Sequence, residues 1–289
     1  MKSPLVFVCS LLAVLAGCGG TPMKAPVMQP AAQTPAAPTA KSGTGTTPNT
    51  PPANTGTGGA TATTNAAPAP SPAPTPALTQ IQSTSGWVLC KTQGHQCAGG
   101  RGHATTSMTE HVASPSMSGD ATQFTLGGNV PYSNAIWYKT LSGDTGPSHF
   151  TYDVYFYLED PQAPQALEFD VNQAIGKNRY VWGTECDFHD THRWNIWDAQ
   201  AGIWRATKVP CDIVSANEWH HLVWQFERVG QRMHYISVTL DDVTSTVDTL
   251  YGFQRGFAGD GYDIAFQMDG NYHQQPYTVW IDKLNLSAW

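Results

Sequence analysis

The chain has 289 residues and a formal net charge of −7, from 15 basic and 22 acidic side chains. Lys2, Lys24 and Lys41 are the only charged residues of the first 80 positions, so the rest of the chain carries 12 basic against 22 acidic residues, a net charge of −10. A surface this acidic does not neutralise phosphates, which excludes nucleic acid as a main partner.

The N-terminus is predicted to be a secretory signal. A positive start precedes an apolar run over 5–17, which is shorter than the roughly 20 residues that span a bilayer. The run ends in Leu15-Ala16-Gly17-Cys18, which resembles the lipobox of bacterial lipoproteins. The resemblance implies a signal peptide over 1–17, cleavage before Cys18 and a lipid anchor on Cys18, the only membrane contact expected. Gly19 replaces the Asp of the inner-membrane retention signal, which implies the outer membrane or cell surface; an ordinary secretory signal with a coincidental cysteine is the alternative.

Residues 18–80 are predicted to be the lipidated cysteine followed by a disordered linker. They consist almost entirely of Thr, Pro, Ala, Gly, Ser, Asn and Gln, and large apolar side chains that could offset the entropy of folding are nearly absent. Pro-rich pieces such as 67–70 keep such a segment partly extended. We interpret it as a stalk below one folded domain, 81–289; a glycosylated or wall-threading segment is the alternative.

The folded domain is predicted to be all-β. Segments of period-two alternation recur, and no stretch of 12 or more residues has the 3.6-residue period of a helix. Turn residues separate the segments, among them 176–178 and 259–261. This spacing predicts an antiparallel sandwich or barrel. The expected strands lie at 150–158, 166–172, 180–185, 219–227, 233–240, 263–269 and 277–286.

Four cysteines follow the lipid site, and an exported protein can keep them oxidised. Proximity in the sequence favours Cys90–Cys97 and Cys186–Cys211 among the pairings that four cysteines allow. A zinc site is the competing hypothesis, but the spacings are not C-x-x-C. Tryptophans gather around the second pair, and indoles exposed there would form a binding platform; burial in the core is the commoner fate. These tryptophans are Trp182, Trp194, Trp197 and Trp204.

The segment Asn217-Glu218-Trp219-His220-His221-Leu222-Val223-Trp224 is followed by a turn at 229–230 and a strand that runs to Asp241-Asp242. This arrangement resembles the paired strands of concanavalin A-like lectin/glucanase and laminin-G-like domains. The C-terminal segment 279–284 also looks like the last strand of such domains. The resemblance implies a jelly-roll sandwich of two antiparallel sheets, one of them concave, and it does not fix the function.

The segment 166–172 carries the most information about function. Its alternation puts Glu168, Asp170 and Asn172 on one side of a strand and the apolar residues between them on the core side. It resembles the Glu-x-Asp-x-x-Glu segment of laminarinase-type glucanases, in which the first Glu is the nucleophile and the last is the acid/base. Glu168 and Asp170 match the first two acids, whereas Asn172 or Gln173 stands where the last Glu is expected.

The missing acid favours binding over catalysis. A retaining glycosidase needs two carboxyl groups about 5–5.5 Å apart, and an amide does not donate a proton as an acid does. Glu168 and Asp170 lie about 6.6 Å apart along a strand. A β-glycan hydrolase or polysaccharide lyase that uses these two carboxyls is therefore the alternative. A protein-binding adhesion module is a further alternative, because laminin-G-like domains also have that role.

Other strands carry similar polar faces. Tyr155 and Tyr157 alternate with apolar residues in 150–158, and Gln267 does so in 263–269. Tyrosine rings stack on the C–H faces of sugars, while carboxylates and amides hydrogen-bond to their hydroxyls. We therefore predict a face that binds carbohydrate or a glycoconjugate; the solvated outer face of a half-buried sheet is the alternative. The residues predicted to line it are Tyr155, Tyr157, Glu168, Asp170, Asn172 and Gln267.

No cofactor is expected, with calcium as the alternative. Some lectin and laminin-G domains hold calcium through Asp, Asn and backbone oxygens, and Asp241 with Asp242, or Asp269 with Asn271, could serve. The loop 187–192 contains two Asp and two His, which could bind zinc or copper. A solvated acidic loop is the preferred interpretation, and no metal site is predicted.

Overall fold

Two antiparallel sheets form the folded part of the chain in the computed structural model, which describes residues 77–90 and 103–289. The predictions about the signal peptide, Cys18, the linker and Cys97 lie outside these residues. Sheet A consists, in spatial order, of β13 (Val243–Gly252), β12 (Arg232–Leu240), β11 (Trp219–Val229), β6 (His149–Leu158), β15 (Tyr277–Ala288), β4 (Ala121–Gly127) and β3 (Thr105–Val112), and β1 (Ala77–Leu78) also pairs with β15. Sheet B consists of β10 (Ile203–Pro210), β9 (Arg193–Asp198), β8 (Thr184–Asp187), β7 (Pro164–Trp182), β14 (Gln254–Gly270), β5 (Asn134–Ser142) and β2 (Val88–Cys90).

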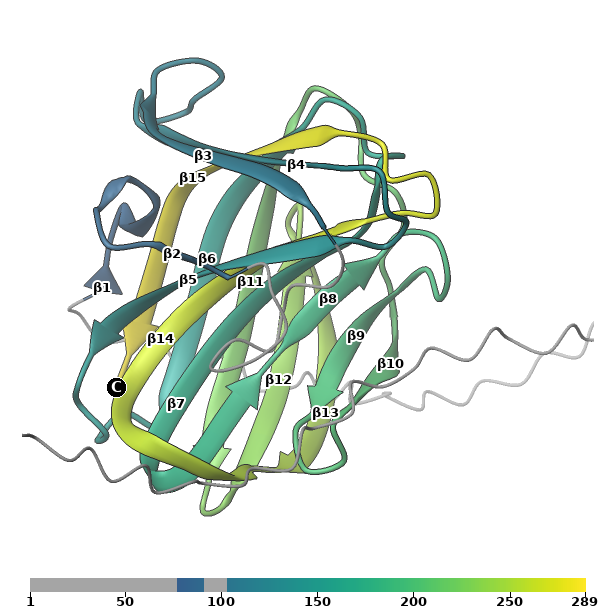
Figure 1. Cartoon of the computed structure of the whole chain (residues 1–289). Coiled ribbons are helices and arrows are strands. Elements are labelled where there is room, and N and C mark those ends of the chain that lie inside the picture. The colour runs from purple at the N-terminus through teal and green to yellow at the C-terminus, as the bar shows by residue number, and fades with distance from the viewer. Residues whose placement is uncertain (1–76, 91–102) are drawn as a thin grey trace, which may run out of the picture. The chain divides into compact units, whose positions relative to one another are not determined.

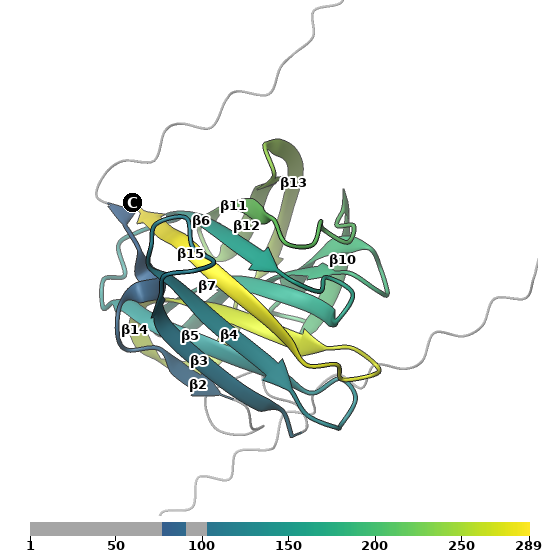
Figure 2. The same cartoon turned by 90° about the horizontal axis from the view of Figure 1, so that it is seen from above.

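The two sheets lie face to face, with β5, β14, β7, β8 and β9 side by side in front of sheet A in Figure 1 and the same layers seen from above in Figure 2. The prediction of an all-β, two-sheet antiparallel jelly-roll sandwich is confirmed. Across the residues described, the sole helix is the 3-10 turn η1 (Ile81–Ser83), and no helix there is long and apolar enough to cross a membrane.

Aromatic side chains from both sheets fill the space between them. Phe156 of β6 packs against Phe169 of β7 with ring centroids 5.5 Å apart, and Phe124 of β4 lies 5.0 Å from Phe266 of β14. Every second residue of β6 is buried, because the pleat directs alternate side chains to the core. Burial of this apolar surface is the main term that holds the sheets together.

The turns predicted at 176–178 and 259–261 are wrong, since both stretches continue as paired strand in β7 and β14. Gly176 lies opposite Gly259 at a register shift and has a φ of 60°. Its N–H donates to Asp260 Oδ1 at 2.9 Å. The glycines therefore mark a bulge within one long strand pair rather than chain reversals.

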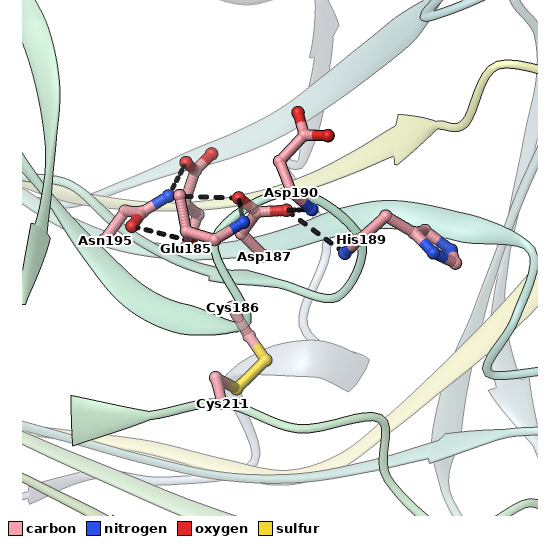
Figure 3. The surroundings of a disulfide bond; sticks show 8 residues. Glu185, Cys186, Asp187, His189, Asp190, Asn195 and Cys211 are labelled. Atoms are coloured by element: carbon pink, nitrogen blue, oxygen red, sulfur yellow. Dashed lines mark hydrogen bonds between the residues drawn. A yellow bond between two sulfur atoms is a disulfide. The ribbon is translucent and has the colours of Figure 1, made fainter. Parts of the chain in front are cut away.

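The disulfide predicted between Cys186 and Cys211 is confirmed, with Cα atoms 5.5 Å apart. It ties β8 to the segment that follows β10 at one edge of sheet B, as Figure 3 shows. The partner predicted for Cys90, Cys97, lies outside the described residues.

The Asp282 carboxylate of β15 fastens the loop between β3 and β4 to sheet A. It accepts hydrogen bonds from Ser116 Oγ at 2.7 Å, from the backbone N–H groups of Met117 and Ser118 at 2.6 and 2.9 Å, and from Ser118 Oγ at 2.6 Å. Burial opposes ionisation, but the bonds from Ser118, Ser116 and Met117 outweigh it and hold the pKa of Asp282 below its usual value.

Candidate functional site

The outer face of sheet B carries the polar side of β7. Glu168, Asp170 and Asn172 point away from the core, while the alternate residues Leu167, Phe169 and Val171 are fully buried between the sheets. The three polar side chains are recessed, with exposed fractions of 5–6%. Asn172 Nδ2 donates to Asp263 Oδ1 of β14 at 2.9 Å.

Register across sheet B extends this polar face over four strands. Gln267 of β14 lies opposite Glu168. On the other side of Glu168 lies Glu185 of β8, and beyond it lies Asn195 of β9. We call Gln267, Glu168, Glu185 and Asn195 the acid–amide row. The sequence did not single out Glu185 or Asn195, because cross-strand neighbours are not encoded in local periodicity.

The row includes two members of a tight group of carboxylates. One oxygen each of Glu168, Glu185 and Asp269 lies within 4.8 Å of the others, and we call these three residues the carboxylate cluster. The Gln267 amide donates to Glu168 Oε1 and, at 3.0 Å, to Asp269 Oδ1. Asn195 Nδ2 donates to Glu185 Oε1 at 2.7 Å, as Figure 3 shows. Amide donors thus hold carboxylates that would otherwise repel one another.

Burial and mutual repulsion shift the acidity of these groups. Burial, followed by the charges of Asp269 and Asp170, raises the pKa of Glu168 well above its usual value. Burial also raises the pKa of Glu185 well above its usual value, although the Asn195 bond opposes this. For Asp269, burial raises the pKa to about 6 against the bonds from Asn134 and Gln267. Each carboxyl of the cluster therefore keeps its proton to a higher pH than an exposed carboxyl does.

Aromatic rings stand at both ends of the neighbouring row of sheet B. Asp170 lies opposite Ala265, which in turn lies opposite Tyr138 of β5. In the other direction, the Gly183 carbonyl oxygen accepts a hydrogen bond from the backbone N–H of Trp197 at 3.0 Å. Trp197 in turn lies opposite Trp204 of β10.

The two indoles of this row, Trp197 and Trp204, are half-buried, with ring centroids 5.2 Å apart. A Cβ on Gly183 would lie 2.9 Å from Trp197 Cβ and 3.2 Å from Trp204 Cη2. The two indoles therefore occupy the space that a side chain at position 183 would fill. By contrast, Trp182 and Trp194 are buried in the core. The platform predicted around the disulfide is thus reduced to Trp197 and Trp204.

Tyr155 and Tyr157 do not join this face. Both belong to β6 and point outward from sheet A, since Val154 and Phe156 between them are buried. The Tyr155 ring stacks on His221 at a centroid distance of 4.2 Å. The single shared face predicted for the six candidate residues is therefore corrected to two faces on opposite sides of the sandwich.

Some of the residues predicted as calcium ligands accept hydrogen bonds within the protein. Asp241 accepts His220 Nδ1 at 2.7 Å and the backbone N–H of His221 at 2.9 Å. Asn271 Oδ1 accepts the backbone N–H of His273 at 2.8 Å. Among the residues that the structure describes, the carboxylate cluster is the group whose hard oxygen ligands could hold a divalent cation, and it includes Asp269.

The acidic loop after β8 is built on one carboxylate. Asp187 accepts the backbone N–H groups of His189, Asp190 and Thr191 at 3.3, 3.1 and 2.9 Å. His189 Nε2 lies 3.0 Å from the carbonyl oxygen of Gln162. Figure 3 shows Asp187 closing this loop beside the disulfide, which gives it a structural role.

No model of a known protein family matches the chain, and no curated protein sequence matches it either. Among solved structures it is similar to the cellulose induced protein Cip1, with 9% identity, a TM-score of 0.43, and coverage of 70% of this chain and 90% of that one. It is also similar to alginate lyase Aly36B (11% identity, TM-score 0.39, 59% and 81% covered). A third similar structure is a family 11 carbohydrate-binding module from Clostridium thermocellum (12% identity, TM-score 0.36, 73% and 93% covered). Similarity at these sequence identities and TM-scores does not indicate the activity of this chain.

Proposed function

We propose that the outer face of sheet B binds a carbohydrate chain. The observation that carries the proposal is the acid–amide row: two amides and two carboxylates from four neighbouring strands point to one side of the sheet. Together they offer the acceptors and donors that sugar hydroxyls need. Trp197 and Trp204, half-buried beside the row, add ring faces on which sugar C–H groups stack.

Affinity electrophoresis tests the proposal. The full-length chain, purified in detergent, is run through native gels that contain one polysaccharide each, neutral or anionic, with calcium or with EDTA. We expect at least one polysaccharide whose retardation of the chain is abolished by Glu168→Gln and by Asp170→Asn. Asp248→Asn is the matched control, because Asp248 is an exposed aspartate on sheet A. If every polysaccharide retarded both sheet B variants as strongly as the wild type, the site would be refuted. Saturable binding to a protein that sugars do not compete would support an adhesion module instead.

Cleavage of the bound glycan is the second candidate function, and the carboxylate cluster is the observation that favours it. A retaining glycosidase places two carboxyl groups about 5–5.5 Å apart, one ionised and one protonated. Oxygens of Glu168 and Glu185 lie within 4.8 Å, and the pKa of each is raised by burial. Glu185, from the adjacent strand, thus supplies the carboxyl that β7 lacks, and it replaces Asp170 as the candidate partner of Glu168.

Product analysis separates cleavage from binding alone. Incubation with the polysaccharides that retard the chain would release new reducing ends for a hydrolase, or unsaturated uronates that absorb ultraviolet light for a lyase. Glu185→Gln should lower the rate of release far more than it weakens retardation, because the amide still hydrogen-bonds but supplies no proton. A chain that binds without releasing either product is a binding protein only.

We further propose that the chain is exported and anchored through a lipid on Cys18, on the grounds of its leader and Pro-rich linker. Metabolic labelling with an alkyne fatty acid tests this. Cys18→Ser should lose the label, whereas Cys9→Ser, inside the apolar run, should keep it. Proteolysis of intact cells tests surface exposure, and an unlabelled wild-type chain would refute the anchor.

A further inference from the structure

The outer face of sheet A carries a row of aromatic side chains that plays no part in the sheet B site. Tyr157 of β6 lies opposite Trp219 of β11 on one side and opposite Trp280 of β15 on the other. The ring centroids of Tyr157 lie 5.5 Å from each of the two indoles. Tyr157 and Trp219 are half-buried, while Trp280 is largely buried and backs the row. We call these three residues the aromatic row.

Hydroxyl groups occupy the next row of the same face. Thr278 of β15 lies opposite Thr125 of β4, and Thr125 lies opposite Ser107 of β3. Since Leu158 pairs with Val279, Glu159 follows β6 beside Thr278. We call Ser107, Thr125, Thr278 and Glu159 the hydroxyl row. The strands β3, β4 and β15 that carry most of it lie side by side in both Figure 1 and Figure 2.

An open pocket of about 410 Å³ lies over the hydroxyl row, and all four residues of the row line it. Asp160 and Thr105 add a carboxylate and another hydroxyl to its wall. None of the residues described as lining the pocket is basic, whereas two are acidic. This charge balance disfavours uronates and sulfated sugars and suits a neutral sugar, whose hydroxyls can donate to Glu159 and Asp160.

The two rows meet on β6 and β15, where Tyr157 and Glu159, and Trp280 and Thr278, are two residues apart, a separation of about 6.6 Å. Aromatic faces therefore stand directly beside a pocket of hydroxyls and carboxylates, which is the pairing that recognises a pyranose by its C–H face and its rim of hydroxyls. We propose that the outer face of sheet A is a second glycan-binding site, specific for neutral sugars, formed by the aromatic row and the hydroxyl row. It uses no residue of sheet B.

Affinity electrophoresis of the full-length chain in detergent tests this site. The gels contain hydroxyethylcellulose, galactomannan or xylan as neutral probes, and alginate or polygalacturonate as anionic ones. We expect at least one neutral probe to retard the chain. Trp219→Ala and Tyr157→Ala should each weaken that binding about tenfold, the scale of one lost stacking contact. Thr278→Val, which removes a hydroxyl with little change in shape, should weaken it severalfold.

Controls separate this site from a folding defect and from the sheet B site. Trp289→Ala removes a partly exposed indole, stacked on His149 at a distance of 5.3 Å near the start of β6, and should leave binding unchanged. Thr278→Val should keep the thermal midpoint of the wild type. Glu168→Gln should leave binding by the sheet A site intact, so that the two proposals can fail separately. The proposal would be overturned if no neutral probe retarded the chain. It would also be overturned if the Trp219, Tyr157 and Thr278 variants were retarded as strongly as the wild type.

Discussion

Glu168 of β7 lies directly opposite Glu185 of β8, so that two carboxylates face each other across one strand pair. Like charges placed opposite each other destabilise a sheet, and burial adds a cost for each charge that remains. Amide donors from Gln267 and Asn195 offset part of this cost. Natural sheets carry such a conflict where function requires it, which is why this pair is the centre of the proposed site.

The first prediction concerns the pH dependence of stability. The pKa values of Glu168 and Glu185 are raised, and those of Asp170 and Asp269 are raised to about 8 and about 6, from usual values near 4. Between about pH 4 and pH 8 the folded state therefore binds more protons than the unfolded state, so stability falls as the pH rises. Urea unfolding should give a larger free energy of unfolding at pH 5 than at pH 8.

The Glu185→Gln variant isolates the contribution of the cluster to this effect. It should be more stable than the wild type at pH 8 and should show a smaller difference between pH 5 and pH 8. Asp212→Asn, at an exposed position, should follow the wild type. A wild-type stability that is flat or rising over this range would contradict the raised pKa values.

The second prediction concerns the Asp282 carboxylate, which accepts bonds from the loop between β3 and β4. Asp282→Ala removes a buried carboxylate that accepts hydrogen bonds from Ser116, Met117 and Ser118, and should lower the free energy of unfolding by about 3–5 kcal/mol. Asp282→Asn should cost less, because the amide oxygen still accepts. Urea midpoints measure both variants, and an Ala variant as stable as the wild type would show that these bonds do not hold the loop.

The third prediction concerns the disulfide. Cys186 and Cys211 are separated by 25 positions, and closing a loop of this size stabilises by roughly 3–4 kcal/mol in the chain-entropy account. The double variant Cys186→Ala/Cys211→Ala should lose about this amount in urea unfolding at 25 °C. The change in the free energy of unfolding when reductant is added to the double variant measures the contribution of the remaining cysteines. If the double variant without reductant unfolds at the wild-type urea midpoint, the disulfide does not constrain sheet B.

The fourth prediction concerns the glycine under the indoles. Gly183→Ala places a Cβ at 2.9 Å from Trp197 Cβ, which forces the indole to move. We expect the variant to fold and to bind glycan severalfold more weakly at the sheet B site in affinity electrophoresis. Gly143→Ala is the matched control, because a Cβ there meets nothing within 4 Å. Equal binding by both glycine variants would remove Trp197 from the site.

Strand prediction succeeded where the contrast between the two faces of a strand is strong and failed where it is weak. The alternation of β6 and β11 is clear, and both strands lie where the sequence predicted them. The sequence Thr-Thr-Ser-Met-Thr-Glu-His-Val of β3 contains few apolar residues, and none of it is fully buried, so it gave no strand signal. Its pairing with β4 fixes it as a strand instead.

The sequence by itself determined the class of the fold, favoured the pairing of Cys186 with Cys211, and predicted the alternation of polar and apolar side chains over 150–158, 166–172 and 263–269. These properties are local, because the pleat alternates side chains regardless of what lies beside the strand. Only the tertiary structure decided that β6 and β7, consecutive along the chain, belong to opposite sheets, which separates Tyr157 from Glu168. It alone brought Gln267 to Glu168 across 99 positions, and Glu185 beside them, because strand pairing depends on long-range contacts that no local period records.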